Sequence, residues 1–387
     1  MLALYPLRIF GKGKTYYKMK PRIIAFYLPQ FHPFKENDEW WGKGFTEWTN
    51  VGKAKPLFKG HNQPRVPTEL GYYDLRLPIV REQQAQMARE AGVEGFCYWH
   101  YWFGNGKRLI ADIFDEVLES GKPDFPFCLG WANHSWYAKN WNSDGTSTNK
   151  LLMEQTYPGM EDEMMHFAFL LKAFKDKRYI KVNGAPLFYI FAPKDVPQEY
   201  LDNFRKWTKE AGFPDLYLVA NISTHSITKE AMLAKGFNAV SYQRLGGITS
   251  NALRNMGRAG RGIQRVWLNV KGFITHRPPF MTDYKKYLPF LVTEQDKEKD
   301  VIPCIIPQWD HTPRSGWNGT FFVNVKPEYF YENVKHALDA VKNKPEQEQL
   351  IFLKSWNEWG EGNMMEPDLT YGRGFIEALR KAVDDEK

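Results

Sequence analysis

Short apolar runs separated by amphipathic stretches are the feature of this sequence that most limits its fold. The runs are rich in Ile, Val, Phe and Tyr, and they lack the alternation of a half-exposed strand. Continuous apolar runs of this length are typical of parallel strands that are covered on both faces. We count eight of them, at residues 23–28, 95–99, 126–131, 186–191, 216–220, 238–242, 301–307 and 350–354.

The stretches between these runs have the periodicity of amphipathic helices. They lie at residues 78–91, 110–120, 161–174, 197–211, 227–235, 326–341 and 374–384. Gly92, Gly121 and Gly212 follow three of them, as glycines do at helix C-termini. The repeated strand–helix alternation predicts an α/β fold, a single (β/α)8 barrel with long loops after strands 1 and 6. We expect one domain over residues 21–387, preceded by a disordered extension at residues 1–20.

The net charge of +7 is concentrated in one segment. From Arg244 to Thr282 there are seven Arg or Lys residues, including Arg277, and no acid. The segment is either a solvated basic loop or, around Arg244–Arg277, a site for an anionic sugar, a phosphate or a lipid head group. Nucleic acid is not favoured as a partner, because no nucleic-acid-binding motif accompanies the charge.

Cys97, Cys128 and Cys304 each lie inside an apolar run, which predicts buried, reduced thiols and a reducing compartment. The apolar stretch near the N-terminus is short and interrupted by Pro6, unlike a secretory signal. No run reaches the roughly 18 apolar residues of a transmembrane helix. The glycine-rich patches lack a nucleotide-binding pattern. We therefore expect a cytoplasmic protein without a cofactor.

Polar and aromatic residues follow the ends of seven of the eight runs. The C-terminal ends of barrel strands meet on one face, where barrel enzymes carry their chemistry. The aromatic content of 16% also favours a lined cleft. The candidates for substrate binding on this face are Tyr27, Gln30, His32, Trp48, Trp99, His100, Tyr101, Trp131, Asn133, His134, Gln308, Trp309, Asn357 and Trp359.

Two carboxylates directly after the last run are the strongest chemical signal. Glu358 and Glu361 stand three residues apart, between Trp356, Asn357 and Trp359. Residues at this spacing share one side of a helical turn. One carboxyl group can transfer a proton while the other acts as base or nucleophile, and indole faces stack on pyranose rings. The pattern favours a carbohydrate-active enzyme over the alternative of a solvated loop. Glu366 is interpreted as a structural or rim acid.

Several other polar residues have two interpretations. Glu47 and Asn50 form either a hydrogen-bond network in the first long loop or a site for sugar hydroxyls. His32, His100, His134 and His311, with Asp310, suggest zinc only weakly, because no closely spaced ligand pair is present. We therefore expect no metal. His61 and His166 are expected at the surface.

Five segments resemble the WbsX family, whose members occur in bacterial O-antigen and capsule loci and are labelled glycosyltransferases. They lie at residues 26–33, 37–50, 95–103, 129–133 and 356–362, within a similarity that runs from about Pro21 to Pro367. The WbsX family is in turn similar to family 99 glycoside hydrolases, retaining endo-α-mannosidases on a (β/α)8 barrel. Their catalytic segment reads Asn-Glu-Trp-His-Glu-Gly, where this chain has Gly360 in place of His.

The resemblance implies a role for each carboxylate. Glu361 would be the general acid/base, and Glu358 would help the sugar's own 2-hydroxyl group attack the anomeric carbon. The expected activity is cleavage, with retention, of an α-linked oligosaccharide or polysaccharide such as a mannan or a bacterial surface glycan. One alternative is a glycosyltransferase or transglycosylase of O-antigen or capsule biosynthesis, with Arg244–Arg277 holding a phosphate. A further alternative is an inactive glycan-binding protein.

Overall fold

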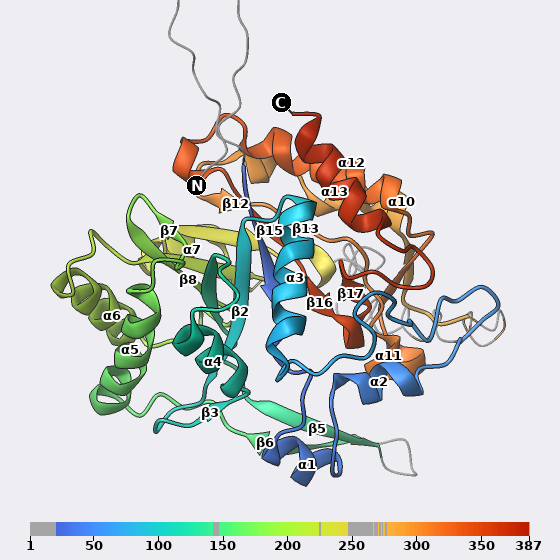
Figure 1. The fold of residues 1–387 in the computed structure, drawn as a ribbon, viewed down its shortest axis with the longest axis horizontal. Helices are drawn as coiled ribbons and strands as arrows, with labels where there is room; N and C mark the ends of the chain where they lie inside the picture. The colour runs from blue at the N-terminus through green and yellow to red at the C-terminus, as the bar shows by residue number, and fades with distance from the viewer. Residues whose placement is uncertain are drawn as a thin grey trace, which may run out of the picture.

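The structure is a computed structural model, and it describes residues 21–386 except 142–146, 224–225, 247–265, 267–269, 271, 273 and 275–276. A parallel barrel forms its centre, with helices packed around the outside (Figure 1). The expectation of a disordered extension at residues 1–20 lies outside the described residues. The strands of the barrel are β1 (Arg22–Tyr27), β2 (Gly95–Trp102), β4 (Phe127–Trp131), β8 (Ala185–Ile190), β9 (Tyr217–Ile222), β10 (Ala239–Tyr242), β12 (Val301–Ile302), β13 (Cys304–Ile305) and β15 (Leu350–Leu353).

The seventh predicted strand is divided in two, and its halves close the barrel. β12 pairs in parallel with β10, whereas β13 pairs in parallel with β15. Pro303 lies between the halves and has no N–H to donate to a neighbouring strand, which accounts for the break. Its carbonyl still accepts a hydrogen bond from Phe352 N at 2.9 Å. The prediction of an eight-stranded (β/α)8 barrel is confirmed.

The predicted outer helices are present with bounds that differ from the expectation by at most two residues. Gly92 ends one of them in the left-handed conformation, at φ 90°. Glycine adopts this conformation without steric cost because it has no Cβ. The helices are α3 (Pro78–Ala91), α4 (Asp112–Ser120), α5 (Met160–Phe174), α6 (Gln198–Glu210), α7 (Lys229–Ala234), α12 (Pro327–Val341) and α13 (Gly374–Asp384).

The two predicted long loops contain structure of their own. The first carries α1 (Lys35–Trp41) and α2 (Glu47–Lys53), and the second carries η1 (Arg244–Gly246), β11 (Met281–Asp283), α10 (Tyr284–Leu291) and η2 (Glu294–Lys297). The sequence reading missed the hairpin of β5 (Trp136–Trp141) and β6 (Ser147–Met153), which extends beside α1 (Figure 1). It also missed the short elements β3 (Arg108–Leu109), β7 (Lys181–Val182), α11 (Thr312–Ser315), η3 (Gly316–Asn318), β14 (Phe321–Val323), η4 (Glu346–Glu348), β16 (Asn357–Glu358), η5 (Trp359–Glu361) and β17 (Asn363–Met364).

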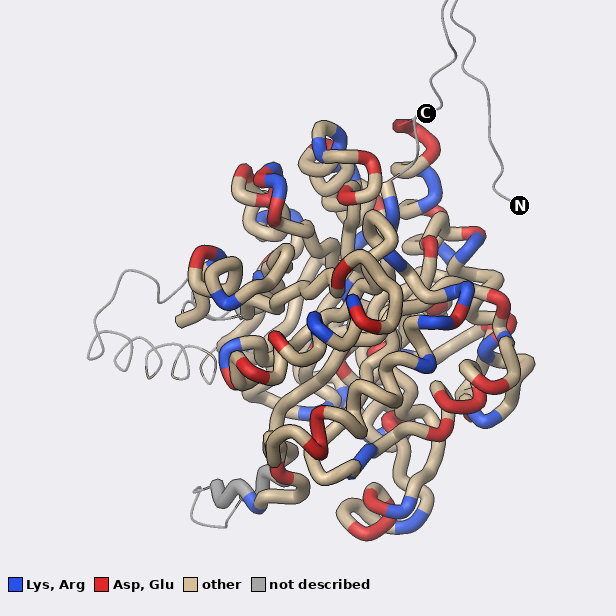
Figure 2. The backbone as a smooth tube through the Cα atoms, turned by 90° about the vertical axis from the view of Figure 1, so that its left-hand side faces the viewer, with Lys and Arg blue, Asp and Glu red and all other residues tan. Residues whose placement is uncertain are grey.

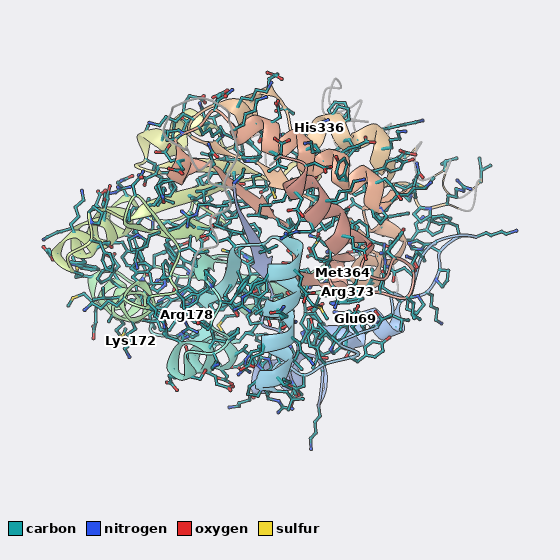
Figure 3. The ribbon with its side chains drawn as sticks, turned by 45° about the horizontal axis from the view of Figure 1, so that its top comes forward. Glu69, Lys172, Arg178, His336, Met364 and Arg373 are labelled. Carbon is teal, nitrogen blue, oxygen red and sulfur yellow. The ribbon has the colours of Figure 1, made fainter. Side chains whose placement is uncertain are left out.

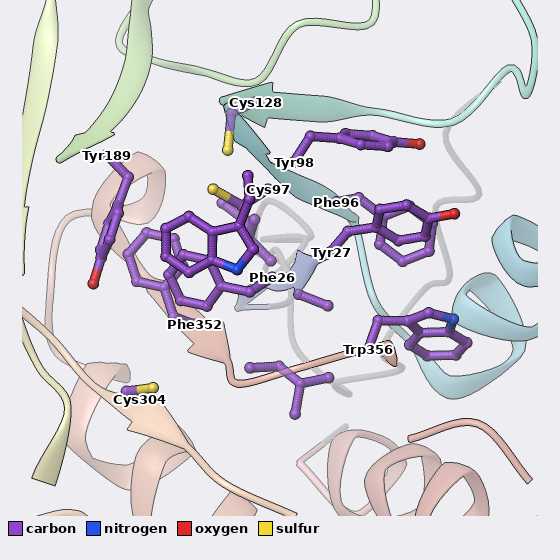
Figure 4. Close-up of a cluster of buried hydrophobic side chains, with 14 of the residues drawn as sticks. Phe26, Tyr27, Phe96, Cys97, Tyr98, Cys128, Tyr189, Cys304, Phe352 and Trp356 are labelled. Carbon is purple, nitrogen blue, oxygen red and sulfur yellow. The ribbon is translucent and has the colours of Figure 1, made fainter. Parts of the chain in front are cut away.

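Aromatic rings fill the interior of the barrel. The ring of Phe26 stacks on Trp99 at 4.7 Å. It also stacks on Phe352 at 5.2 Å and meets Tyr189 edge-on at 4.8 Å, and these three rings lie together in Figure 4. Rings at these separations contribute roughly 0.5–1.5 kcal/mol per pair beyond the burial of their area. The same layer contains the cysteines, and all three are buried and free, as predicted.

Charged residues of both signs are interspersed over the outer helices (Figure 2). Arg373, for example, pairs with Glu69 at 2.6 Å and Glu90 at 2.7 Å, and Figure 3 shows Glu69 and Arg373 side by side. In the basic segment, Arg244 is bound to Asp296 at 2.8 Å, and five of its seven cations lie outside the described residues. No helix in the described part of the chain is long and apolar enough to span a membrane.

Candidate active site

Strand alternation decides which side chains face the interior of the barrel. In β2, Trp99 and Tyr101 point inward, whereas His100 and Trp102 contact His166 on the outer helix α5. On the neighbouring strand, a Cβ at Gly130 would lie 3.3 Å from the Trp99 ring, so the absence of a side chain there makes room for the indole. The inward position of Trp99 brings its N–H to the end of β15.

The segment after β15 is fixed to the barrel through Asn357. Its Oδ1 accepts a hydrogen bond from Leu28 N at 2.8 Å, and its Nδ2 donates to Leu28 O at 3.0 Å. Asn363 Oδ1 accepts from Ser355 N at 3.0 Å, and β16 pairs antiparallel with β17. Glu358 and Glu361 therefore stand on a well-anchored support rather than on a free loop.

Glu358 is the buried member of the pair, at 6% exposure. Trp99 Nε1 donates a hydrogen bond to its Oε1 at 2.9 Å. Burial, followed by the charge of Glu361, raises the pKa of Glu358 to about 7, while Lys354 and Arg314 oppose the rise. A carboxyl group with this pKa can give up or take up a proton near neutral pH.

Glu361 is the more accessible member and is bound by an arginine. Arg314 Nη1 donates to Glu361 Oε1 at 2.5 Å, and Arg314 Nη2 lies 2.9 Å from Glu47 Oε2. His311 Nε2 lies 3.8 Å from the same Glu361 oxygen. α2 and α11 bring Glu47 to the carboxylate pair, where it belongs to a hydrogen-bond network with Arg314.

Gly360 is required by this arrangement. A Cβ at this position would lie 2.0 Å from Glu47 Oε2 and 3.1 Å from Arg314 Nε. Glu47 and Arg314 therefore occupy the space that a side chain at position 360 would need. A histidine at position 360, as in the Asn-Glu-Trp-His-Glu-Gly segment, would therefore not fit this arrangement of Glu47 and Arg314.

Tyr101 completes the group of side chains around the carboxylates. It is 7% exposed, and burial together with the charges of Glu358, Glu47 and Glu361 raises the pKa of its hydroxyl. Its ring meets Trp136 edge-on at 5.2 Å, so the β5–β6 hairpin begins beside the site. The phenol stays protonated at neutral pH and can donate a hydrogen bond.

The remaining substrate-binding candidates lie in three settings. Three face the outer helices, and three tie segments together through hydrogen bonds, as Asn133 does with Ala192 and Tyr157. The residues that face the outer helices are Tyr27, His100 and Trp131. The residues that tie two segments together are Asn133, Gln308 and Asn357. The residues that pack in the loops or at the rim of the barrel are Gln30, His32, Trp48, His134 and Trp359. Trp309 lies under Lys354, with its ring centroid 5.7 Å from the ammonium nitrogen. Trp99, Tyr101 and Trp309 are therefore the candidates that lie near the two carboxylates or beside Lys354.

The expectation that His61 and His166 lie at the surface is wrong. His166 is fully buried, and its ring nitrogens contact His100 Nε2 at 2.9 Å and the Tyr200 hydroxyl at 2.7 Å. The His61 side chain is 4% exposed and bonds Asp310 Oδ2 at 2.9 Å. Both histidines sit in amphipathic or loop sequence, where a buried polar partner leaves no periodic signal. Within the described residues, no three His, Cys, Asp or Glu side chains are grouped to hold a metal.

Sequence reasoning missed Arg314 and Lys354. Arg314 lies in the loop after the seventh strand, which has no pattern that separates it from other surface arginines. Lys354 did carry a signal, because it is a charged residue at the end of a run that is buried on both faces.

Comparison with known proteins places the chain in a family. The family described as Glycosyltransferase WbsX matches residues 23–379. Two relatives, each described as "Uncharacterized protein WxcX", come from two strains of Xanthomonas campestris pv. campestris and are 31% identical over 373 and 372 residues. The alignment covers 93% of this chain and 49% of each relative, so the chain spans about half their length.

Solved structures share the barrel at low sequence identity. A protein described as glycoside hydrolase-like is 15% identical, with a TM-score of 0.56 and coverage of 98% of this chain and 97% of its own. The GH99 endo-alpha-mannosidase from Bacteroides thetaiotaomicron, in complex with bis-tris-propane, is 15% identical, with a TM-score of 0.55 and coverage of 94% and 96%. At this identity the likeness concerns the fold. The chain belongs to the WbsX family and folds as the (β/α)8 barrel that these glycoside hydrolases share.

Proposed function

We propose that this protein is a carbohydrate-active enzyme that cleaves an α-linked glycan, a mannan-like or bacterial surface polysaccharide, with retention. The observation that carries the proposal is the pair Glu358 and Glu361 at the C-terminal end of β15, with a tryptophan N–H on one and an arginine on the other. Carboxylates in two different environments are what a glycosidic cleavage needs, because one has to donate a proton and one has to act as a base.

The resemblance to family 99 suggests how the two would divide the work. Glu358 would take the proton of the sugar's 2-hydroxyl group as that oxygen attacks the anomeric carbon and the glycosidic bond breaks. Glu361 would give its proton to the departing oxygen and then remove one from the incoming water. Arg314 holds Glu361 through a 2.5 Å contact, so we expect substrate binding to loosen this contact before Glu361 carries a proton. Of the sugar-binding candidates, Trp99 and Tyr101 have the clearest place in this scheme.

A glycosyltransferase or transglycosylase is the second candidate, and the description of the family favours it. A transferase would pass the sugar to an acceptor other than water and would need an activated donor. The proposed phosphate site at Arg244–Arg277 gains no support from Arg244, which is bound to Asp296. An inactive glycan-binding protein is the third candidate. We also propose a cytoplasmic location, because the three free cysteines suit a reducing compartment.

The deciding experiment incubates the purified protein with α-mannans and bacterial surface glycans, first in buffer and then with sugar nucleotides or lipid-linked donors. Mass spectrometry reads the products. The double variant Glu358→Gln/Glu361→Gln, purified in parallel, controls for contaminating hydrolases. New reducing ends in buffer alone support the hydrolase. Products that form only with an activated donor support the transferase, and glycan binding without any product supports the binding protein.

A further inference from the structure

Lys354 is a buried cation that the packing of the barrel does not explain. It ends the apolar run of β15 and is only 7% exposed. Within the described residues, its Nζ has one hydrogen-bond acceptor, Gln243 Oε1 at 3.1 Å, and no carboxylate within 4.0 Å. An ammonium group carries three N–H donors. Burying a charge that has few partners costs on the order of several kcal/mol in proteins. The described part of the chain therefore supplies one hydrogen-bond acceptor for three donors.

The position of Lys354 is inside the barrel, beside the carboxylates. Gln243 follows β10, and its Nε2 donates to the hydroxyl of Tyr189, whose ring belongs to the aromatic core. The Trp309 ring lies 5.7 Å from Nζ. Nearby, on the paired strands β9 and β10, the buried Asn221 Oδ1 and Ser241 Oγ have no hydrogen-bond partner among the described residues. This wall of the barrel is thus rich in polar groups that the protein itself does not satisfy.

The charges around Lys354 limit what its partner can be. Among the described residues, the acids Glu358, Glu361 and Glu47 and the cations Arg314 and Lys354 lie in this region. An anionic substrate group beside Glu358 and Glu361 would lie next to carboxyl groups in a region of low dielectric, where like charges repel strongly. A neutral partner with several oxygen acceptors fits better, and sugar hydroxyl groups supply such acceptors.

We propose that Lys354 is a substrate-binding residue whose ammonium donates hydrogen bonds to hydroxyl oxygens of a neutral sugar, the one whose glycosidic bond lies against Glu358 and Glu361. The Trp309 ring provides an apolar surface for the same sugar, and Gln243 fixes the ammonium. This inference rests on the proposed glycan-cleaving function and adds a sugar subsite to it.

Lys344 offers a matched control, because it is also a lysine at 7% exposure. Its Nζ donates to the backbone oxygens of Asp296, at 2.7 Å, and Val301, so its charge has partners within the fold. We compare Lys354→Met with Lys344→Met, since methionine keeps the length of the side chain and removes the charge. Three measurements are made on each: the thermal midpoint, kcat/KM on a cleaved glycan, and glycan binding by calorimetry in a Glu361→Gln background.

Lys354→Met is expected to keep or raise the thermal midpoint, because replacing a poorly paired buried charge with an apolar group is often neutral or stabilising. Its kcat/KM and its glycan affinity should fall by about 10- to 100-fold, the loss of one or two hydrogen bonds to a charged donor. Lys344→Met should show the reverse, with a lower midpoint and unchanged kcat/KM.

Two results would overturn the inference, and they are distinguishable. If Lys354→Met lowers the midpoint as Lys344→Met does and leaves glycan binding and kcat/KM unchanged, Lys354 is structural and the proposed function stands. If the wild type neither cleaves nor binds any glycan, both the proposed function and the sugar subsite at Lys354 are refuted.

Discussion

Glu358 and Glu366 lie in one short segment after β15, and burial raises the pKa of both to about 7, but their surroundings differ. Glu366 accepts hydrogen bonds from Tyr73 at 2.8 Å, Gln84 at 2.6 Å and Trp359 at 2.6 Å. Glu358 accepts one, from Trp99, and otherwise faces charged groups. The comparison shows that burial and a raised pKa alone do not identify a catalytic acid.

The hydrogen-bond donors around Glu366 come from three separate parts of the chain. Tyr73 belongs to the loop before α3, Gln84 to α3 and Trp359 to η5. Glu366 therefore joins the first long loop and an outer helix to the segment that carries the carboxylates. Glu358 instead accepts the Trp99 hydrogen bond and lies among the charged groups Glu361, Lys354 and Arg314. The following predictions separate the two ends of the segment, from the largest expected effect to the smallest.

Removal of Arg314 should have the largest effect on stability, and it acts at the end of the segment that carries Glu358 and Glu361. Arg314→Met leaves Glu47 and Glu361 as neighbouring acids without their cation, and breaking such a pair is expected to cost about 3 kcal/mol of stability. Chemical denaturation measures the loss. Adding Glu47→Gln to this variant should recover part of the stability, because it removes one of the two carboxylates that have lost their cation. An unchanged stability in Arg314→Met would show that the ion pairs are not formed in solution.

The stability difference between wild type and Glu358→Gln should depend on pH. Glu358 has a pKa of about 7 when folded against an ordinary value of 4.5, so the folded protein holds this proton more tightly than the unfolded chain does. The stabilisation that protonated Glu358 gives the folded protein is therefore fully present below pH 4.5 and is lost as the pH rises through 7. The wild type should lose up to about 3 kcal/mol relative to the variant between pH 4 and pH 8.

Denaturant midpoints at several pH values measure this difference. Glu366 titrates in both proteins and cancels in the comparison. A difference that stays constant from pH 4 to pH 8 would mean that Glu358 has an ordinary pKa.

Glu366→Gln should affect stability and spare turnover. An amide group turns one acceptor into a donor that faces Tyr73, Gln84 or Trp359, and an unsatisfied buried group costs roughly 1–3 kcal/mol. The denaturant midpoint should fall, while kcat per folded molecule stays within a few-fold of wild type. A large fall in kcat with an unchanged midpoint would reverse the roles that we give to the two glutamates.

Gly360→Ala tests the packing between the two ends of the segment. The new Cβ would lie 2.0 Å from Glu47 Oε2, so Glu47 has to move away from Arg314. Overpacking of this kind costs about 1–3 kcal/mol, and we expect the lower part of that range because a side chain can shift. Gly52→Ala is the control, since nothing lies within 4 Å of its Cβ. Equal thermal midpoints for both variants would show that Glu47 does not cover Gly360.

The barrel was predictable from sequence because its signal is local. Eight apolar runs and the helices between them, with caps such as Gly92, follow from periodicity and turn chemistry. Glu358 and Glu361 were predictable as a pair because three residues separate them. Arg314 and Glu47 were not paired in advance, because 267 residues separate them along the chain and only the closed barrel brings them together.

The errors among the binding candidates have a common physical cause. Residues that follow a strand were all assigned to one face, but side chains alternate along a strand, so Trp99 faces the interior while His100 faces α5. To decide which side chains of a strand face the interior, one residue of that strand or its neighbour must have a known direction. The glycine at position 130 is such a residue in the structure, because a Cβ there would lie 3.3 Å from the Trp99 ring.

The most direct test of the account compares turnover of Glu361→Gln and Glu366→Gln on one cleaved glycan, with wild type alongside. The account predicts that Glu361→Gln, in which Arg314 keeps its contact with Glu47, loses a factor on the order of 10² to 10⁴ in kcat per folded molecule, as expected for removal of a general acid/base. Glu366→Gln should retain turnover. Wild-type kcat in Glu361→Gln, with the loss of turnover confined to Glu366→Gln, would contradict the assignment of the catalytic pair.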